Sequence, residues 1–330
     1  MKIAVVILNW NGKKLLETFL PSVMQHSPEA SIYVADNAST DDSVAFVKAH
    51  FPSITVIQNH SNLGFAGGYN ESLQKVDADI YALVNSDIEV SPNWLQPIID
   101  KFQNEPKTGI IQPKILDFKN KAYFEYAGAA GGFIDQYGYP FCRGRIFETI
   151  EKDTDQYDDE TDIFWASGAC FFIRKEVFQE LNGFDADFFA HQEEIDLCWR
   201  AFNLGHQIKY TSKSVVYHVG GATLQQGNPR KTFLNFRNSL LMLVKNLPKS
   251  NLFQILLIRL VLDGVAGIQF FLKGKPQHTW AIVKAHFSFY SLFFKNYKKR
   301  SSQQLPNYFI TKSIIYRYYI QNNSIFTKIF

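Results

Sequence analysis

The sequence predicts an α/β protein with a parallel, doubly wound sheet and a C-terminal amphipathic helical extension. Four short apolar stretches in the first 90 residues alternate with amphipathic stretches, which is the spacing of strand–helix–strand units. Each apolar stretch is followed at once by polar residues, as expected where parallel strands end at a ligand-binding edge. The charge also divides the chain: 14 Lys or Arg and one acid lie from Arg237 to the end, against 20 basic and 30 acidic residues before it. We therefore expect an acidic globular part and a separate basic segment.

The first 115 residues carry the alternation of strands and helices. Strands are predicted at residues 3–8, 31–35, 54–57 and 80–84. Helices are predicted at residues 13–25, from 40 or 41 through 46, 69–76 and 92–102. Thr40 or Asp41 is expected to cap the second of these helices, and Pro92 suits the first position of the last one.

The remainder of the chain has a different pattern. Between residues 109 and 165, short apolar runs alternate with Gly, Tyr and acidic clusters, which predicts extended segments joined by loops. A strand, a small-residue turn and a second strand are predicted over residues 164–173, then helices over 175–181 and 194–204, and a strand at 215–218. We therefore divide the chain into a nucleotide-binding α/β half (1–115), a second half of the same domain (116–240), and a basic, apolar helical tail (241–330).

Composition and the missing motifs exclude several classes of protein. With 46% hydrophobic residues, a chain of 330 residues can bury a full core. Cys142, Cys170 and Cys198 have no metal-ligand spacing and are expected to be reduced thiols in a cytosolic protein. The first apolar run is too short for a signal-peptide core. No G-x-G-x-x-G follows the first strand and no G-x-x-x-x-G-K-[ST] occurs, which counts against a dinucleotide enzyme and a P-loop ATPase.

The tail is apolar as well as basic. Residues 252–272 contain 14 Leu, Ile, Val or Phe, close to the length that spans a bilayer, but also Arg259 and Asp263. At about +3 kcal/mol for each charge and about −0.45 kcal/mol for each large apolar residue, the insertion free energy is near zero. We therefore expect interfacial amphipathic helices, with lysines such as Lys273 and Lys275 facing anionic headgroups. The alternative is an ordinary helical appendage packed on the core.

Polar motifs at the ends of the four predicted strands form a candidate ligand-binding edge. They are Asn9-Trp10, Asp36, the glycine-rich stretch from Asn62 to Asn70, and Asn85-Ser86-Asp87. Because parallel strands end at one edge of a sheet, we expect these motifs to line one site. Asp87 suits a hard divalent cation that also binds phosphate oxygens, and Asp36 suits a base or ribose. Gly64 and Gly67 would let a ligand approach the backbone. Taken singly, Asp87 could instead close an Asx turn and Asp36 could cap a helix.

A second acidic cluster consists of Glu193, Glu194 and Asp196. On a helix, Glu193 and Asp196 share a face, and Asp196 is spaced for an ion pair with Arg200. Glu194 then points elsewhere, toward a substrate. Crowded carboxylates raise one another's pKa, and a raised pKa is what a general base near neutral pH needs. The alternative is a solvated helical face.

Together these motifs resemble the inverting family 2 glycosyltransferases, and their rhamnosyltransferase-like members in particular. The resemblance rests on the segments at residues 5–12, 34–41, 62–70, 85–87, 193–200 and 217–221. It covers about residues 1–240, in the order of the family. It implies a GT-A fold, a nucleotide-sugar donor and a divalent metal, Mg²⁺ or Mn²⁺. It also implies that residues 1–115 bind the nucleotide sugar and that residues 116–240 form the acceptor-binding and catalytic half of the same domain.

The resemblance also implies roles in donor and metal binding. Asp36 would contact the nucleotide base, and Asn9 and Trp10 would line the pocket around that base. Asp87 would be the last member of a DXD-type motif, which here reads Asn85-Ser86-Asp87 and lacks the first Asp. Asp87 would bind the metal and the diphosphate, with His218 nearby. The other expected donor contacts are Asn62, Gly64, Gly67, Asn85, Ser86 and Arg237, with Arg230 as the alternative to Arg237.

Catalytic and acceptor roles follow in the same way. Glu194 matches the position of the catalytic base. The family often has Asp at this point, so Asp196 is the second candidate, with Glu193 beside them. The turn that contains Trp165, Ser167 and Gly168 resembles the acceptor subsite.

We therefore expect a glycosyltransferase that moves a sugar, with rhamnose among the candidates, from a dTDP- or UDP-sugar to a hydroxyl of a cell-surface polysaccharide or lipid-linked oligosaccharide. The tail predicts a cytoplasmic protein held peripherally by the anionic inner face of the plasma membrane. The alternatives are a nucleotidyltransferase or other nucleotide-binding α/β enzyme, and a nucleic-acid-binding protein that uses the basic tail. Because the basic residues accompany long apolar runs, a membrane is favoured over nucleic acid as a partner.

Overall fold

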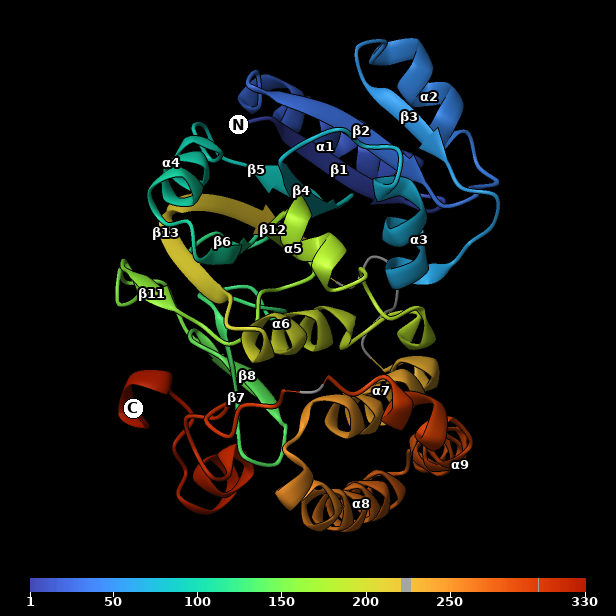
Figure 1. The fold of residues 1–330 in the computed structure, drawn as a ribbon, viewed down its shortest axis with the longest axis vertical. Coiled ribbons are helices and arrows are strands. Elements are labelled where there is room, and N and C mark those ends of the chain that lie inside the picture. The colour runs from blue at the N-terminus through green and yellow to red at the C-terminus, as the bar shows by residue number, and fades with distance from the viewer. Residues whose placement is uncertain (221–226, 302) are drawn as a thin grey trace.

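A nine-stranded mixed sheet runs through the centre of the protein (Figure 1). The computed structural model describes residues 1–220, 227–301 and 303–330. The strand order is β11-β13-β6-β12-β4-β1-β2-β3, and β5 pairs with β13. The strands of this sheet are β1 (Ile3–Asn9), β2 (Ala30–Asp36), β3 (Thr55–Gln58), β4 (Ile80–Asn85), β5 (Ile88–Val90), β6 (Thr108–Asp117), β11 (Glu160–Asp162), β12 (Cys170–Arg174) and β13 (Gln207–His218).

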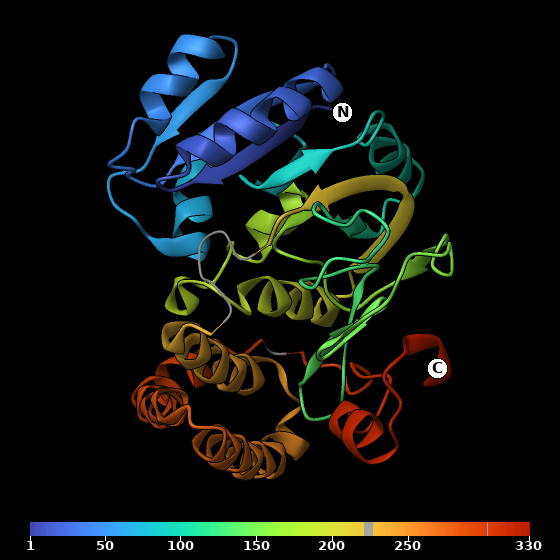
Figure 2. The ribbon, with the colours of Figure 1, turned by 180° about the vertical axis from the view of Figure 1, so that it is seen from behind.

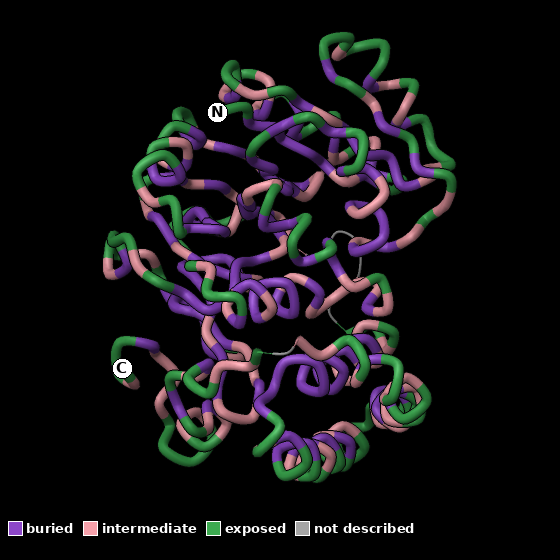
Figure 3. Tube along the Cα trace, in the orientation of Figure 1, coloured by how far each residue is buried: buried purple, intermediate pink, exposed green. Residues whose placement is uncertain are grey.

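Helices cover both faces of the sheet, as a doubly wound arrangement requires. One hydrophobic cluster joins the sheet to α1, α2 and α4, and another joins it to α3, α5 and α6. The bounds are α1 (Lys13–His26), α2 (Ser43–His50), α3 (Gly64–Leu73), α4 (Gln96–Asn104), α5 (Lys175–Glu180) and α6 (Glu193–Asn203). The buried stretches of the chain concentrate in the sheet and in α6 (Figure 3).

The four predicted N-terminal strands are confirmed, and they are parallel to one another. The sheet as a whole is mixed, because β12 lies antiparallel between β4 and β6. The predicted short strand at 215–218 is the end of the 12-residue β13, which runs parallel to β6. Residues from beyond position 115 therefore complete the sheet that the first 115 residues begin.

Three helix boundaries differ from the prediction. Helix α4 begins at Gln96 rather than Pro92, because Asn93 has a φ of 61° and turns the chain before the helix. Helix α3 begins at Gly64, so the glycine-rich stretch is mostly helical. Helix α2 begins at Ser43, so Asp42 occupies the capping position that was predicted for Thr40 or Asp41. Asp41 still contacts the first turn, because its Oδ1 accepts a hydrogen bond from Ser43 N at 3.1 Å.

The tail is helical, as predicted, and packs against α6 and the turn between β7 (Gly132–Ile134) and β8 (Pro140–Cys142). Helices α7 (Pro229–Asn246), α8 (Lys249–Leu272) and α9 (Pro276–Lys298) lie on the side of α6 that faces away from the sheet (Figure 1). The chain then returns over a small antiparallel sheet, and the C-terminus lies beside that sheet (Figure 2). The remaining elements are β9 (Arg145–Ile146), β10 (Thr149–Ile150), the 3₁₀ turns at Ala186–Phe188 and Phe326–Lys328, and a π turn at Tyr316–Ile320.

Buried polar contacts fix this last segment in place. Asp135, which is 0% exposed, accepts a hydrogen bond from Ile314 N at 3.0 Å. Tyr308 donates its hydroxyl to Gln136 O at 2.7 Å. The residues after α9 are therefore an integral part of the fold.

Candidate active site

Asn9 and Asp36 meet at the carboxyl ends of β1 and β2, as predicted. Asn9 Nδ2 donates a hydrogen bond to Asp36 Oδ1 over 3.1 Å, and Asp36 Oδ2 accepts another from Ser39 N at 3.0 Å. Asn9 and Asp36 are buried, whereas Trp10 is 48% exposed. Asn9 therefore orients Asp36, and Trp10 is available at this edge to cover a flat ring.

The end of β4 lies beside these residues. A side chain on Gly12 would come 2.4 Å from Asn9 Oδ1 and 3.6 Å from Ser86 Oγ. Leu8 and Asn85 are neighbours in the register of β1 and β4. The structure thus brings together the predicted motifs that follow the first, second and fourth strands.

Asp87, His218 and Glu125 form a buried row of charges next to this edge. His218 Nε2 lies 3.2 Å from Asp87 Oδ1, and His218 Nδ1 lies 3.2 Å from Glu125 Oε1. Burial opposes a charge on His218, but the two carboxylates outweigh it and raise its pKa to about 10. Burial acts to raise the pKa of Asp87, but His218 reverses the effect and holds that pKa below its ordinary value. Glu125 was not predicted, since nothing in its local sequence marks it.

This row fits a divalent-metal site with two protein ligands, Asp87 and His218. Metal-binding histidines commonly direct their second ring nitrogen at a carboxylate, which orients the ring. Here Nδ1 faces Glu125 while Nε2 faces Asp87. Within the described ranges, no group of three or more His, Cys, Asp or Glu is arranged as a complete metal site. A metal held here would therefore complete its coordination with phosphate oxygens and water.

Protein atoms fill the space beside the glycines of the glycine-rich stretch. A Cβ on Gly64 would come 2.4 Å from Phe189 O, and a Cβ on Gly67 would come 2.7 Å from Leu63 Cβ. Asn62 Oδ1 accepts a hydrogen bond from Gly64 N at 2.9 Å at the start of α3. Asn62, Gly64 and Gly67 therefore fix the start of α3, and a contact between these residues and a donor stays a prediction.

Glu194 has the properties of a general base. It lies in the first turn of α6, where burial raises its pKa to about 7. Its Oε2 is buried and has no hydrogen-bond partner in the described part of the chain. Burial and the charge of Glu194 hold the pKa of the neighbouring Glu193 well above its ordinary value. The two adjacent carboxyls therefore each resist ionisation more than an exposed glutamate does.

Asp196 is engaged in ion pairs, which argues against its role as the alternative base. Its Oδ2 lies 2.7 Å from Lys245 Nζ and 2.9 Å from Arg200 Nε, and its Oδ1 accepts a hydrogen bond from Asn246 at 2.9 Å. The predicted pair with Arg200 is confirmed. Burial acts to raise the pKa of Asp196, but Lys245 and Arg200 outweigh it and lower the pKa. The residue joins α6 to α7.

The backbone before α6 is strained. Phe189, His191 and Gln192 have φ values of 63°, 71° and 72°, which are unusual for residues with side chains. Such strain persists only where surrounding contacts hold it, and it concentrates at functional sites. One such contact comes from α3, where Phe65 N donates to Phe189 O at 2.8 Å and Ala66 N donates to it at 3.3 Å.

Helix α7 holds the same segment from the other side. Asn238 is fully buried and its Nδ2 lies within hydrogen-bond distance of three carbonyl oxygens, those of Phe188 (2.9 Å), Ala190 (2.9 Å) and His191 (2.7 Å). Arg237, predicted to contact the donor, instead donates to the carbonyl oxygens of Asp187 and Phe188 at 2.9 and 3.1 Å. Both residues therefore brace the segment that leads to Glu194. Asn238 was missed because its partners lie about 50 residues earlier in the sequence.

Unsatisfied polar atoms gather at the start of α6. Four consecutive residues each have one buried polar atom without a hydrogen-bond partner among residues that the structure describes: His191 Nε2, Gln192 Oε1, Glu193 Oε2 and Glu194 Oε2. Such atoms are rare in folded proteins, and a cluster of them indicates a place where a ligand supplies the missing bonds. Burial and the charge of Lys231 lower the pKa of His191 to about 4, so its ring is neutral near pH 7.

Of the three residues predicted for the acceptor, only Gly168 adjoins Glu194. A Cβ on Gly168 would come 3.7 Å from the carboxyl carbon of Glu194. Trp165 is 3% exposed and donates its indole N–H to Phe133 O at 2.8 Å. Ser167 is 1% exposed and donates its hydroxyl to Ala127 O at 2.8 Å. The predictions for Trp165 and Ser167 are therefore corrected to supporting roles.

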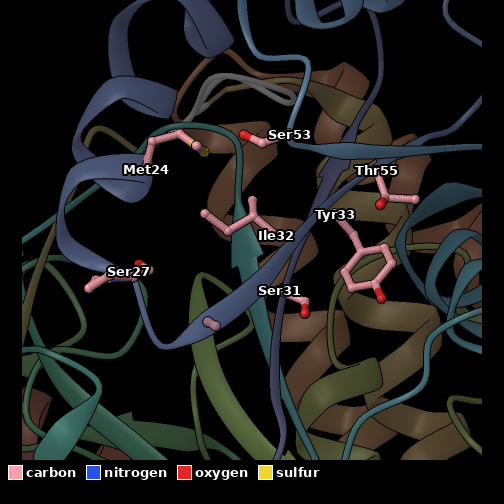
Figure 4. A pocket seen from close by; sticks show the side chains of 9 residues that line it. Met24, Ser27, Ser31, Ile32, Tyr33, Ser53 and Thr55 are labelled. Atoms are coloured by element: carbon pink, nitrogen blue, oxygen red, sulfur yellow. The ribbon is translucent and has the colours of Figure 1, made fainter.

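A shallow hollow of about 350 Å³ lies elsewhere, between the end of α1 and the beginnings of β2 and β3 (Figure 4). Met24, Ser27, Tyr33 and Thr55 are among its lining residues. It is at the amino ends of these strands, whereas Asp36 is at the carboxyl end of β2. Because none of the residues assigned to the candidate site lines it, we do not connect it with the chemistry.

Comparison with known proteins identifies the family of this chain. Residues 4–181, more than half of the chain, match the family described as Glycosyl transferase family 2. The N-acetylglucosaminyl-diphospho-decaprenol L-rhamnosyltransferase of Mycobacterium tuberculosis is 24% identical over 229 residues, which cover 65% of this chain and 75% of the relative. A low-salt glycan biosynthesis hexosyltransferase of Haloferax volcanii is 24% identical over 204 residues, covering 60% of this chain and 61% of the relative.

Solved structures show the same fold. Residues 1–349 of S. aureus TarS in complex with UDP-GlcNAc match with a TM-score of 0.56 and 15% identity, covering 90% of each chain. A mannosyltransferase from Pyrobaculum calidifontis in complex with GDP-Man and Mn²⁺ matches with a TM-score of 0.53 and 13% identity, covering 88% of this chain and 87% of that one. The predicted GT-A fold is confirmed, and the chain is a member of glycosyl transferase family 2.

Proposed function

We propose that this glycosyltransferase transfers a sugar from a nucleotide diphosphate to an acceptor hydroxyl with inversion at the anomeric carbon. The observation that carries the proposal is Glu194, a buried carboxyl with a pKa of about 7 and an unpartnered oxygen among the described residues. A single base of this kind is sufficient for a direct displacement, because no covalent intermediate has to form. The family match removes the grounds for the nucleotidyltransferase alternative.

The donor occupies the edge formed by β1, β2 and β4. Asp36, held by Asn9, accepts hydrogen bonds from the nucleotide, and the exposed Trp10 covers its base. Ser86 lies at the same edge near Gly12. A dTDP- or UDP-sugar is the expected donor, and the structural relatives named above were solved with UDP-GlcNAc and GDP-Man.

A divalent metal, Mg²⁺ or Mn²⁺, would be held by Asp87 and His218. When bound, such an ion offsets the negative charge that develops on the departing diphosphate. Glu125 orients His218, and the mannosyltransferase named above was solved with Mn²⁺. Because metal binding requires a neutral imidazole, His218 must give up the proton that Asp87 and Glu125 stabilise in the free protein.

The acceptor lies between Gly168 and the start of α6. Glu194 takes the proton of the acceptor hydroxyl while that oxygen bonds to the anomeric carbon and the bond from this carbon to the diphosphate oxygen breaks. Burial and the charge of Glu194 also raise the pKa of the neighbouring Glu193. His191 and Gln192 offer their unpartnered polar atoms to other groups of the acceptor.

The acceptor class is a growing glycan or a lipid-linked oligosaccharide, with rhamnose among the candidate sugars. The name of the mycobacterial relative describes rhamnosyl transfer to N-acetylglucosaminyl-diphospho-decaprenol, which supports this choice. The apolar helix α8 and the basic residues of the tail support a position at an anionic membrane surface. We therefore place the chain in the cytoplasm, peripherally bound to that face by its tail.

A thermal-shift series with UDP, dTDP and GDP, each with and without Mn²⁺ or Mg²⁺, tests the donor site. A ligand at 100 times its Kd adds about 2.7 kcal/mol to the free energy of unfolding. We expect a metal-dependent shift with one diphosphate, and its loss in Asp87→Asn. If no diphosphate shifts the transition, the proposed donor site is wrong.

A further inference from the structure

The outer surfaces of α8 and α9 form a large exposed apolar face, which we call the docking face. On α8 it consists of Phe253, Leu257, Val261, Val265, Ile268, Phe271 and Leu272, which are 58–80% exposed. On α9 it consists of Trp280, Phe287, Tyr290 and Phe294, which are 51–76% exposed. Scattered apolar residues are normal on protein surfaces, but contiguous faces of this kind mark interaction sites.

The polarity of α8 is reversed relative to an ordinary surface helix. Its two charged residues after the first turn, Arg259 and Asp263, are 2% and 1% exposed and point into the protein. Arg259 donates to Tyr137 O at 2.8 Å and to Ser239 Oγ at 2.7 Å, while Asp263 Oδ2 lies 3.2 Å from His286 Nε2. A helix at a water-facing surface turns its charges outward. The outer side of α8 is therefore built to meet an apolar medium.

The contacts of α8 favour a position along a surface over one that crosses a membrane. By length and composition alone it is long and apolar enough to cross one, with a mean hydropathy of 2.0. However, Leu252, Ile255 and Leu256 are buried against the rest of the protein. Arg259 is bonded to the turn between β7 and β8. Crossing a bilayer would break these contacts and expose Arg259 and Asp263 to lipid.

Basic residues border the docking face. Lys273 and Lys275 lie in the turn between α8 and α9, and Lys284 and Lys298 lie on the exposed side of α9. In the described ranges, none of these four lysines forms an ion pair with a carboxylate. From Arg237 to the end of the sequence the only acid is Asp263, which is buried. A second copy docked on the same face would bring lysines against lysines, whereas an anionic lipid surface supplies the opposite charge.

We propose that the docking face inserts into one leaflet of an anionic bilayer, with α8 and α9 lying in the plane of the membrane. The aromatic residues of α9 lie at the headgroup level, where Trp and Tyr are favoured. The lysines at the turn and on α9 contact the anionic headgroups. This inference gives a physical basis to the proposed location of the enzyme, but it does not depend on the transfer chemistry.

Vesicle sedimentation with the full-length protein tests this proposal. The vesicles are phosphatidylcholine alone, or phosphatidylcholine with anionic phosphatidylglycerol. We expect binding to the anionic vesicles and weaker binding to the neutral ones. Each lysine near an anionic surface strengthens binding about fivefold, so Lys273→Gln/Lys275→Gln should reduce binding to anionic vesicles by about twentyfold or more.

The decisive variant is Leu257→Glu/Ile268→Glu, which places two charges on the exposed side of α8. We expect it to abolish vesicle binding while its melting temperature stays close to that of the unmodified protein, because both positions already face water. The matched control is Gln25→Glu/Gln103→Glu, which makes the same charge change at exposed positions of α1 and α4 and should bind as before.

Three results would overturn the proposal. The first is unchanged vesicle binding by the Leu257/Ile268 variant. The second is a dimer in solution that this variant dissociates, since the face would then belong to a second copy. The third is equally tight binding to neutral and anionic vesicles, which would show that the lysines do not contact anionic headgroups. Donor binding by the thermal-shift series is measured without vesicles, so failure of the donor site and failure of the docking face are distinguishable.

Discussion

Replacing Glu194 with Gln should stabilise the folded protein at alkaline pH and abolish turnover. Burial raises the pKa of Glu194 from 4.5 to about 7, so the folded state keeps this proton over a range in which the unfolded state has lost it. Stability therefore falls as the pH rises from about 4.5 to about 7. Each pKa unit corresponds to about 1.4 kcal/mol, so a pKa raised from 4.5 to about 7 lowers the free energy of unfolding at alkaline pH by about 3 kcal/mol. Gln, which has the same shape and no charge, avoids this loss.

The effect is measurable as a difference in melting temperature. For 330 residues, an unfolding entropy of about 2.1 cal/mol/K per residue converts 3 kcal/mol into about 4 °C. We subtract the melting temperature of the unmodified protein from that of Glu194→Gln. This difference should be about 4 °C larger at pH 8.5 than at pH 4.5. Glu17→Gln, at an exposed position of α1, controls for the removal of a carboxylate. A difference that does not change with pH would refute the assignment of a raised pKa to this buried carboxyl.

Three further substitutions test other parts of the site. Asp87→Asn should keep the fold and lower metal-dependent turnover at least tenfold. Undiminished turnover over a Mn²⁺ titration would contradict the role of Asp87 as a metal ligand. Gly64→Ala should lower turnover and reduce the free energy of unfolding by about 1–3 kcal/mol. The reason is that a backbone φ of 69° is strained for Ala and that its Cβ would meet Phe189 O. Denaturant unfolding and steady-state kinetics measure the two effects. Lys245→Met should destabilise the protein by about 3–5 kcal/mol, because it leaves Asp196 buried with part of its charge uncompensated. If the variant were as stable in urea as the unmodified chain, this ion pair would be dispensable.

The sequence was sufficient to predict the edge at which the site lies. Strands and helices alternate in the first 115 residues, so the positions of Asn9, Asp36 and Asp87 at the ends of strands follow from the topology of a parallel sheet. The structure brings these residues together in the way that this topology requires. The hydrophobic periodicity of each element carries this information locally, and no long-range contact has to be known.

Roles that depend on long-range partners could not be predicted. Glu194 and Asp196 are two residues apart and chemically alike, and what distinguishes them is Lys245, about 50 residues later in the chain. Glu125 reaches His218 across almost 100 positions of sequence, with no motif around it. The glycines near α3 have a sequence typical of ligand-binding loops, but Phe189 fills the space beside Gly64.

The tail shows a signal that the sequence did contain. Arg259 and Asp263 are spaced four residues apart, so they share one side of a helix and can both turn inward. A sum of insertion free energies over the segment includes both charges, whichever side of the helix they occupy. Their placement in the structure leaves the other side free of charge, which a sum over the whole segment cannot show.

The segment from Phe188 to Gln192 is held by two helices that are far apart in the sequence. Helix α3 binds Phe189 O, and Asn238 of α7 binds the carbonyl oxygens on either side of it. For protein engineering, this means that the loop from Phe188 to Gln192 cannot be transplanted by itself. A loop taken from a relative would need its own partners at positions 65, 66 and 238. The smallest exchangeable unit is therefore the loop together with these two supports.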